Sequence, residues 1–159
     1  MDDLAREVLD LCRAAKLRVA TAESCTGGMV AAALTDIAGS SSVVERGFVT
    51  YANEAKTEML GVPAALIAAK GAVSQEVAEA MAAGALAQAP VDLAVAITGV
   101  AGPGGGSAEK PVGLVWFGLA RKGKTVITDR QIFSGDRAAI RAAATHHALS
   151  LLAASARSQ

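Results

Sequence analysis

A continuous apolar run at residues 93–97, with the sequence LAVAI, constrains the fold of this chain more than any other segment. The run has the length of a strand and contains no polar residue, which predicts a strand covered on both faces. Strands of this kind lie in parallel sheets between two layers of helices. The run therefore predicts the centre of an α/β sheet.

The remaining segments alternate between helical and extended patterns. Helices are predicted at residues 3–15, 29–38, 53–60, 75–89 and from residue 136 onward. Further strands are predicted at residues 18–22, 43–51, 112–120 and 125–133, the last two as a hairpin. Asn53 and Ser74 are expected to cap helices, Gly47 to form a bulge and Pro63 to open a turn. The predicted fold is a three-layer α/β/α sandwich with a mixed, mostly parallel central sheet.

Length and composition limit the possible partners. A chain of 159 residues suits one domain, predicted here as 1–159, and its 15 basic and 15 acidic residues give no general basic field for nucleic acid. No segment has the pattern of a leader or of a membrane span, so we expect a cytoplasmic protein with no membrane partner. Cys12 and Cys25 are expected to be reduced thiols. The several apolar helices suggest a homo-oligomer.

The segment 21–28, TAESCTGG, is a candidate catalytic loop. It joins a predicted strand to a predicted helix, so the amides of Thr26, Gly27 and Gly28 lie where a helix attracts negative charge. These amides could stabilise the oxyanion that forms when the Ser24 hydroxyl attacks an amide carbonyl. The alternative interpretation is that Ser24 and Thr26 only cap the helix.

A serine nucleophile needs a neighbouring base, and lysine can serve where burial lowers its pKa. Tyr51 ends a predicted strand and Lys56 lies in the first turn of the next predicted helix, so both could reach the sheet edge that carries Ser24. An exposed lysine in a first helical turn would instead be solvated.

Three other residues have side chains of a type that can take part in such chemistry. Cys25 could form a thiolate near a helix N-terminus, but no histidine partner is evident, and a structural thiol is the alternative. His146 and His147 are adjacent on the last predicted helix, so their side chains diverge. We expect these two histidines on the surface or in packing, and we expect no metal site.

A second glycine-rich segment, 98–107 with the sequence TGVAGPGGGS, follows the most apolar strand. Its many unobstructed amides could cradle a phosphate or a ribose, although it matches neither the dinucleotide fingerprint nor a P-loop. Arg137 and Arg141 lie one turn apart on the last helix and could meet a single anion. Equally, these arginines could be ordinary solvated charges.

Six motifs together resemble the C-terminal domain of the competence-associated CinA proteins. They are TAESCTGG at 21–28, GFVTYANEAK at 47–56, GAVS at 71–74, ITGVAGP at 97–103, KPVG at 110–113 and FSGDR at 133–137. The resemblance covers nearly the whole chain. Members of this family often carry a large N-terminal domain similar to molybdopterin-binding proteins, and the activities of that domain are not expected here.

The resemblance implies hydrolysis of the carboxamide of nicotinamide mononucleotide to nicotinate mononucleotide and ammonia, in pyridine nucleotide salvage. It implies Ser24 as the nucleophile, supported by Tyr51 and Lys56, with no metal and no cofactor. The expected substrate-binding residues are Thr26, Gly27, Gly28, Asn53, Thr98, Gly99, Ala101, Gly102, Arg137 and Arg141. Two alternatives stay open, namely a non-catalytic nucleotide-binding or competence-related interaction module, and a hydrolase of another small amide.

Overall fold

A five-stranded sheet forms the middle layer of the molecule, in the order β2-β1-β3-β4-β5. The computed structural model describes residues 1–158, so the last residue of the predicted 1–159 domain lies outside the described residues. The strands are β1 (Val19–Glu23), β2 (Val44–Val49), β3 (Leu93–Gly99), β4 (Leu114–Arg121) and β5 (Ile127–Ile132). Strand β1 pairs in parallel with β2 and β3, whereas β4 is antiparallel to both β3 and β5. The mixed, mostly parallel sheet is thereby confirmed, with β3 at its centre.

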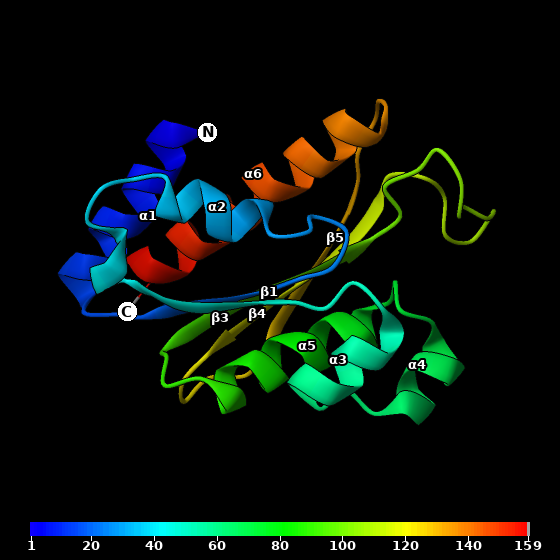
Figure 1. Ribbon diagram of the computed structural model, residues 1–159, viewed down its shortest axis with the longest axis horizontal. Helices are drawn as coiled ribbons and strands as arrows, with labels where there is room; N and C mark the ends of the chain where they lie inside the picture. Colours follow the sequence, from blue (N-terminus) through cyan, green and yellow to red (C-terminus); the bar gives the residue numbers. More distant parts are fainter. Residues whose placement is uncertain (159) are drawn as a thin grey trace.

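Two layers of helices cover the sheet (Figure 1). One face carries α1 (Asp2–Ala15), α2 (Met29–Thr35) and α6 (Arg137–Arg157), and the other carries α3 (Asn53–Leu60), α4 (Ala64–Lys70) and α5 (Gln75–Gln88). A short 3-10 turn, Ser40–Ser42, precedes β2. The predicted three-layer sandwich is confirmed. No helix within residues 1–158 is both long enough and apolar enough to cross a membrane.

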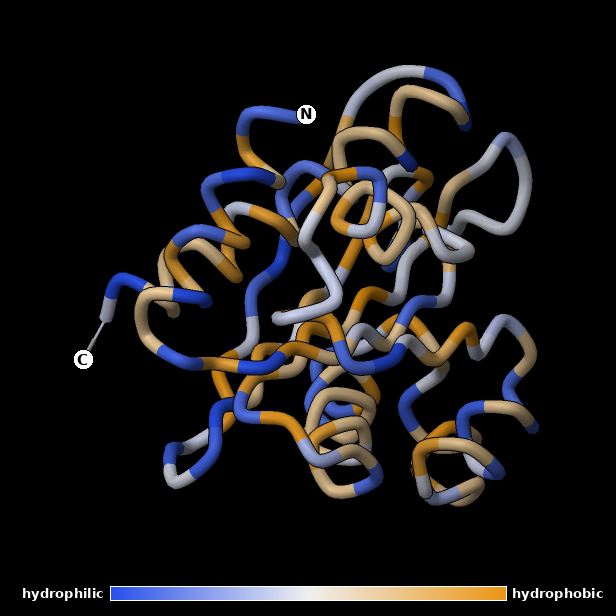
Figure 2. Tube along the Cα trace, turned by 60° about the vertical axis from the view of Figure 1, so that its left-hand side comes forward, coloured by the Kyte–Doolittle hydropathy of each residue, from blue (hydrophilic) through white to orange (hydrophobic). Residues whose placement is uncertain are grey.

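The two faces of the sheet differ in side-chain size. Leu93, Val95 and Ile97 of β3 pack into the core beneath α1 and α6, while Ala94 and Ala96 pack into the core beneath α5. Small residues let α5 approach the sheet closely, and a Cβ atom on Gly118 of β4 would lie only 2.4 Å from the carbonyl oxygen of Ala78. Figure 2 shows the apolar stretches of the chain running through the middle of the molecule.

Side-chain caps begin the two longest helices of the second half of the chain. The Ser74 hydroxyl accepts a hydrogen bond from the Val77 amide at the start of α5, as predicted. The Asp136 carboxylate accepts one from the Ala139 amide at the start of α6. These caps were recognisable because the capping residue and the amide are only three positions apart.

Three local expectations were wrong. Asn53 does not cap α3, because it is the first helical residue and Ala52 occupies the cap position without a side-chain bond. The irregularity of β2 lies opposite Val19 and Ala20 and not at Gly47, which instead approaches Thr21 so closely that a Cβ atom would lie 2.7 Å from its hydroxyl oxygen. The turn predicted at Pro63 is the start of helix α4.

Candidate active site

The carboxyl ends of the three parallel strands bring the candidate catalytic residues together. Ser24 directly follows β1, Tyr51 lies two residues beyond β2, and Thr98 is the last residue but one of β3. Hydrogen bonds tie these ends to one another, since the Ser24 amide donates to the Ile97 carbonyl (2.9 Å) and the Thr50 amide donates to the Glu23 carbonyl (2.9 Å). Ligand sites of open α/β sheets lie at this edge.

Ser24 and Lys56 form a buried pair. The Lys56 Nζ atom lies 3.1 Å from the Ser24 Oγ atom. The same amine donates hydrogen bonds to the backbone carbonyls of Thr50 (3.0 Å) and Tyr51 (3.3 Å). Lys56 is 1% exposed and Ser24 is 9% exposed. The alternative of a solvated lysine is therefore wrong, because the first turn of α3 faces the interior.

Burial changes the acid–base character of this lysine. Removal from water lowers the pKa of Lys56, because a charged amine loses its hydration there, and electrostatic interactions with Cys25 and Glu54 oppose the shift only in part. A larger fraction of the amine is thus neutral than in a solvated lysine. A neutral amine 3.1 Å from a hydroxyl can accept its proton.

The Tyr51 side chain takes a different direction from its backbone. Its phenol is exposed, and the phenolic oxygen accepts a hydrogen bond from Arg137 Nη2 (3.1 Å). Arg137 Nη1 donates to the carbonyl oxygen of Gly102 (2.8 Å). Arg137 therefore links the segment after β2 to the second glycine-rich loop, and the hydroxyl of Tyr51 lies beside a cation at the rim of the site.

The first glycine-rich loop is held by Glu23, a residue that the sequence patterns did not single out. Its fully buried carboxylate accepts hydrogen bonds from the amides of Val30 (2.9 Å) and Ala31 (3.1 Å), at the start of α2. The expectation that Ser24 or Thr26 caps this helix was wrong, because Gly28 occupies the cap position without a side-chain bond. A signal existed in the position of an acidic residue at the end of a buried strand, where a charge needs a partner.

Arg141 meets the same loop from α6. Its Nε atom donates to the carbonyl oxygen of Cys25 (3.0 Å) and its Nη2 atom donates to the carbonyl oxygen of Thr26 (3.4 Å). Arg137 and Arg141, predicted to meet one anion, thus bind different loops.

A cleft of about 290 Å³ opens beside Ser24 and Lys56. Its lining includes most of the predicted site, namely Ser24, Tyr51, Asn53, Lys56, Thr98, Gly99, Ala101, Gly102 and Arg137. Among residues 1–158, the lining leaves out four predicted positions, Thr26, Gly27, Gly28 and Arg141. The Thr98 hydroxyl donates to the Ala72 carbonyl (2.8 Å), so this side chain joins the wall of the cleft to the segment before α5.

Cys25 and the histidines have structural environments. Burial raises the pKa of the Cys25 thiol to about 11, which keeps the thiol protonated near neutral pH. The His147 ring packs 4.6 Å from the Phe117 ring and lies within hydrogen-bond distance of Asp129 (2.5 Å), while His146 is exposed. The expected surface and packing positions are confirmed.

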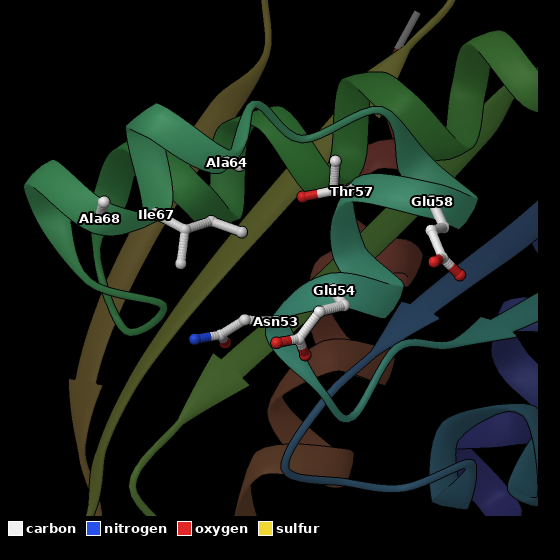
Figure 3. A pocket seen from close by; sticks show the side chains of 7 residues that line it. All are labelled: Asn53, Glu54, Thr57, Glu58, Ala64, Ile67 and Ala68. Atoms are coloured by element: carbon white, nitrogen blue, oxygen red, sulfur yellow. The ribbon is translucent and has the colours of Figure 1, made fainter.

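A second cleft, of about 490 Å³, lies between α3 and α4 (Figure 3). The side chains of Asn53, Ile67 and Ala68 border it, and its ionisable groups are the carboxylates of Glu54 and Glu58. Carboxylates repel an anionic ligand, and this lining contains no group suited to nucleophilic attack. Within the described residues 1–158, no cluster of three or more histidine, cysteine or acidic side chains is placed to hold a metal ion.

Known proteins resemble this chain in both sequence and fold. The chain is 55% identical to the nicotinamide-nucleotide amidohydrolase PncC of Escherichia coli K12 over 94% of this chain and 90% of that protein. It is 57% identical to a CinA-like protein of Mycolicibacterium gilvum, covering 84% of this chain but 32% of that longer protein. The crystal structure of the competence/damage inducible protein CihA from Agrobacterium tumefaciens superposes with a TM-score of 0.94 at 49% identity, covering 96% of this chain and 93% of that one. The CinA C-terminal domain family matches residues 1–156, and this chain belongs to that family.

Proposed function

We propose that this chain is an amidohydrolase that converts nicotinamide mononucleotide and water to nicotinate mononucleotide and ammonia. One observation carries the proposal: a buried lysine amine lies 3.1 Å from a serine hydroxyl at the bottom of a cleft. A protein that only binds a nucleotide has no need of a desolvated lysine beside a serine. The likeness to a relative named as a nicotinamide-nucleotide amidohydrolase supports the choice of substrate.

In the proposed reaction the neutral amine of Lys56 accepts the proton of the Ser24 hydroxyl while Oγ attacks the carboxamide carbon. The carbonyl oxygen becomes an oxyanion, which amides of the first loop stabilise. The intermediate then collapses, its carbon–nitrogen bond breaks, and the amino group leaves as ammonia with the proton from Lys56. Water, deprotonated by the same amine, attacks the acyl-serine ester and releases the nicotinate nucleotide.

The other lining groups are proposed to hold the rest of the substrate. Arg137 supplies a cation for the phosphate, and Tyr51 orients the guanidinium through its hydroxyl. Backbone amides of the loop that contains Gly99, Ala101 and Gly102 surround the ribose, since no bulky side chains obstruct them. A volume of about 290 Å³ suits a mononucleotide, because small-molecule sites begin at about 300 Å³.

The proposed setting is the cytoplasm, where a phosphorylated substrate and two free thiols, Cys12 and Cys25, are both at home. A homo-oligomer is also proposed, on the basis of the apolar side chains that remain exposed on β2 and β5, Val49, Ile127 and Ile132. Sedimentation velocity of the purified chain tests the assembly, and a single species of 15.9 kDa would contradict it.

Ammonia release from nicotinamide mononucleotide tests the proposed activity. We expect release by the native chain, a loss of at least about 10³-fold in Ser24→Ala, and no effect of a chelator such as EDTA. Nucleotide binding without ammonia release would instead indicate a binding module. Faster hydrolysis of another small amide would retain the chemistry but change the substrate.

A further inference from the structure

Most backbone amides near Ser24 already have acceptors, which narrows the choice of oxyanion donors. The Gly27 amide donates to the Ser24 carbonyl (3.0 Å), and the Met29 amide donates to the Thr26 carbonyl (3.0 Å). The next two amides, at the start of α2, donate to the carboxylate of Glu23. Within residues 1–158, the amides of Cys25, Thr26 and Gly28 are the ones in this loop that no hydrogen bond to the protein engages.

The orientation of the Thr26 amide is set from outside the loop. In a trans peptide unit the C=O and N–H groups point in opposite directions, and the bond between Cys25 and Thr26 is trans. Arg141 Nε binds the C=O group of this unit at 3.0 Å. The N–H group of Thr26 must therefore point away from the guanidinium and from α6.

The direction away from α6 leads to the side of the catalytic amine. Helix α6 covers one face of the sheet, and α3, which carries Lys56, covers the other (Figure 1). Lys56 reaches Ser24 from that second face. A Thr26 amide turned away from α6 thus faces the side on which the proposed attack takes place.

We infer that Arg141 is a positioning residue that holds the Cys25–Thr26 peptide unit so that the Thr26 amide binds the oxyanion. The inference rests on the proposed amidohydrolase function. It replaces the phosphate-binding role that the sequence suggested for Arg141, because two of its nitrogen atoms already donate to backbone carbonyls. Arg137, which lines the cleft, remains the cation for the phosphate.

Gly27 provides a second, independent sign that this contact is built into the loop. A Cβ atom at this position would lie 3.1 Å from Arg141 Nη2, and the backbone has φ of +59°. A side chain there would crowd the guanidinium and strain the backbone. Glycine thus leaves room for the arginine to reach both carbonyls.

The test is the variant Arg141→Met, which removes the donors and the charge but retains much of the side-chain volume. We expect kcat for nicotinamide mononucleotide to fall roughly 10²-fold, as when one oxyanion donor is lost, while KM changes by less than about threefold. The matched control is Arg13→Met. Arg13 holds the Gly39 carbonyl (3.0 Å) at the other edge of the sheet in a similar way, so this variant reports the cost of losing a guanidinium–carbonyl contact alone.

A substrate without the phosphate separates positioning from phosphate binding. Hydrolysis of nicotinamide riboside should fall by the same factor in Arg141→Met as hydrolysis of the nucleotide. A loss confined to the nucleotide, or a rise in KM with unchanged kcat, would overturn the inference. If Arg141→Met does not fold, Arg141→Lys, which keeps a charge and one donor, should show a smaller loss of kcat with the same pattern on both substrates.

Crystal structures of the native chain and of Arg141→Met make this test independent of the proposed function. Failure of the native chain to release ammonia would remove the proposed substrate and leave the loop geometry to be judged directly. A rotated Cys25–Thr26 peptide unit in the variant supports the positioning role. An unchanged peptide unit would show that Arg141 does not orient it, whatever the kinetics.

Discussion

The amine of Lys56 lies 3.1 Å from the hydroxyl of Ser24, although the two residues are 32 positions apart in the chain. Ser24 follows a strand, and Lys56 comes from the helix behind the neighbouring parallel strand. Two backbone carbonyls hold the amine in place, so the lysine is oriented by the main chain and not by an acidic partner. This arrangement favours a neutral amine, because no carboxylate bonds directly to it.

The first prediction concerns pH. Burial lowers the pKa of Lys56, and the neutral amine is the proposed base, so kcat/KM should rise with pH along a limb centred below the usual lysine value of about 10.4. In Lys56→Arg the guanidinium stays protonated, and we expect a loss of roughly 10²–10⁴-fold throughout the measurable range. A limb with an unchanged midpoint in Lys56→Arg would assign it to another group.

The same shift has a sign for stability. The folded chain binds the Lys56 proton more weakly than the unfolded chain does, so burial of this amine costs stability at neutral pH, and the cost diminishes as pH rises toward 10.5. Lys56→Met should remove this dependence, which urea unfolding at several pH values can measure.

The second prediction separates Cys25 from Ser24 as the nucleophile. Because the pKa of the Cys25 thiol is about 11, little thiolate exists near neutral pH. Cys25→Ala should therefore retain at least about a tenth of the native ammonia release, whereas Ser24→Ala should not. Loss of activity in Cys25→Ala with a native melting temperature would point to the thiol.

The third prediction addresses the Tyr51 hydroxyl, whose part in proton transfer stays a prediction. Its partner in the structure is Arg137, so Tyr51→Phe should chiefly raise KM for the nucleotide, by roughly 3- to 10-fold, through a less ordered guanidinium. Steady-state kinetics on the nucleotide and on its riboside measure this effect. If turnover of both substrates instead slowed by roughly two orders of magnitude or more, the hydroxyl would belong to the proton transfer.

The fourth prediction concerns stability. Glu23→Ala leaves the amides of Val30 and Ala31 buried without acceptors, and we expect the free energy of unfolding to fall by about 2–4 kcal/mol. Glu23→Gln, which keeps one acceptor, should lose less. Glu79→Ala on the exposed side of α5 is the matched control and should change stability by less than about 0.5 kcal/mol. Equal losses in Glu23→Ala and the control would show that the carboxylate does not anchor α2.

Local patterns account for the elements that were predicted correctly. The apolar run of β3, the serine cap of α5 and the aspartate cap of α6 depend on residues close together in the chain. Predictions failed where a distant contact decided the outcome. Glu23, from the preceding strand, holds the start of α2, although Ser24 and Thr26 have the residue types of helix caps.

The sequence by itself determined the layered fold, the two glycine-rich loops and, through resemblance, the set of catalytic candidates. Spacing could not show that Lys56 is buried, because a first helical turn can face either water or the core. Only the tertiary structure placed its amine against Ser24 and assigned Arg137 and Arg141 to different loops. The physical reason is that desolvation and hydrogen-bond geometry depend on which elements pack together, and parallel strands bring distant segments to one edge.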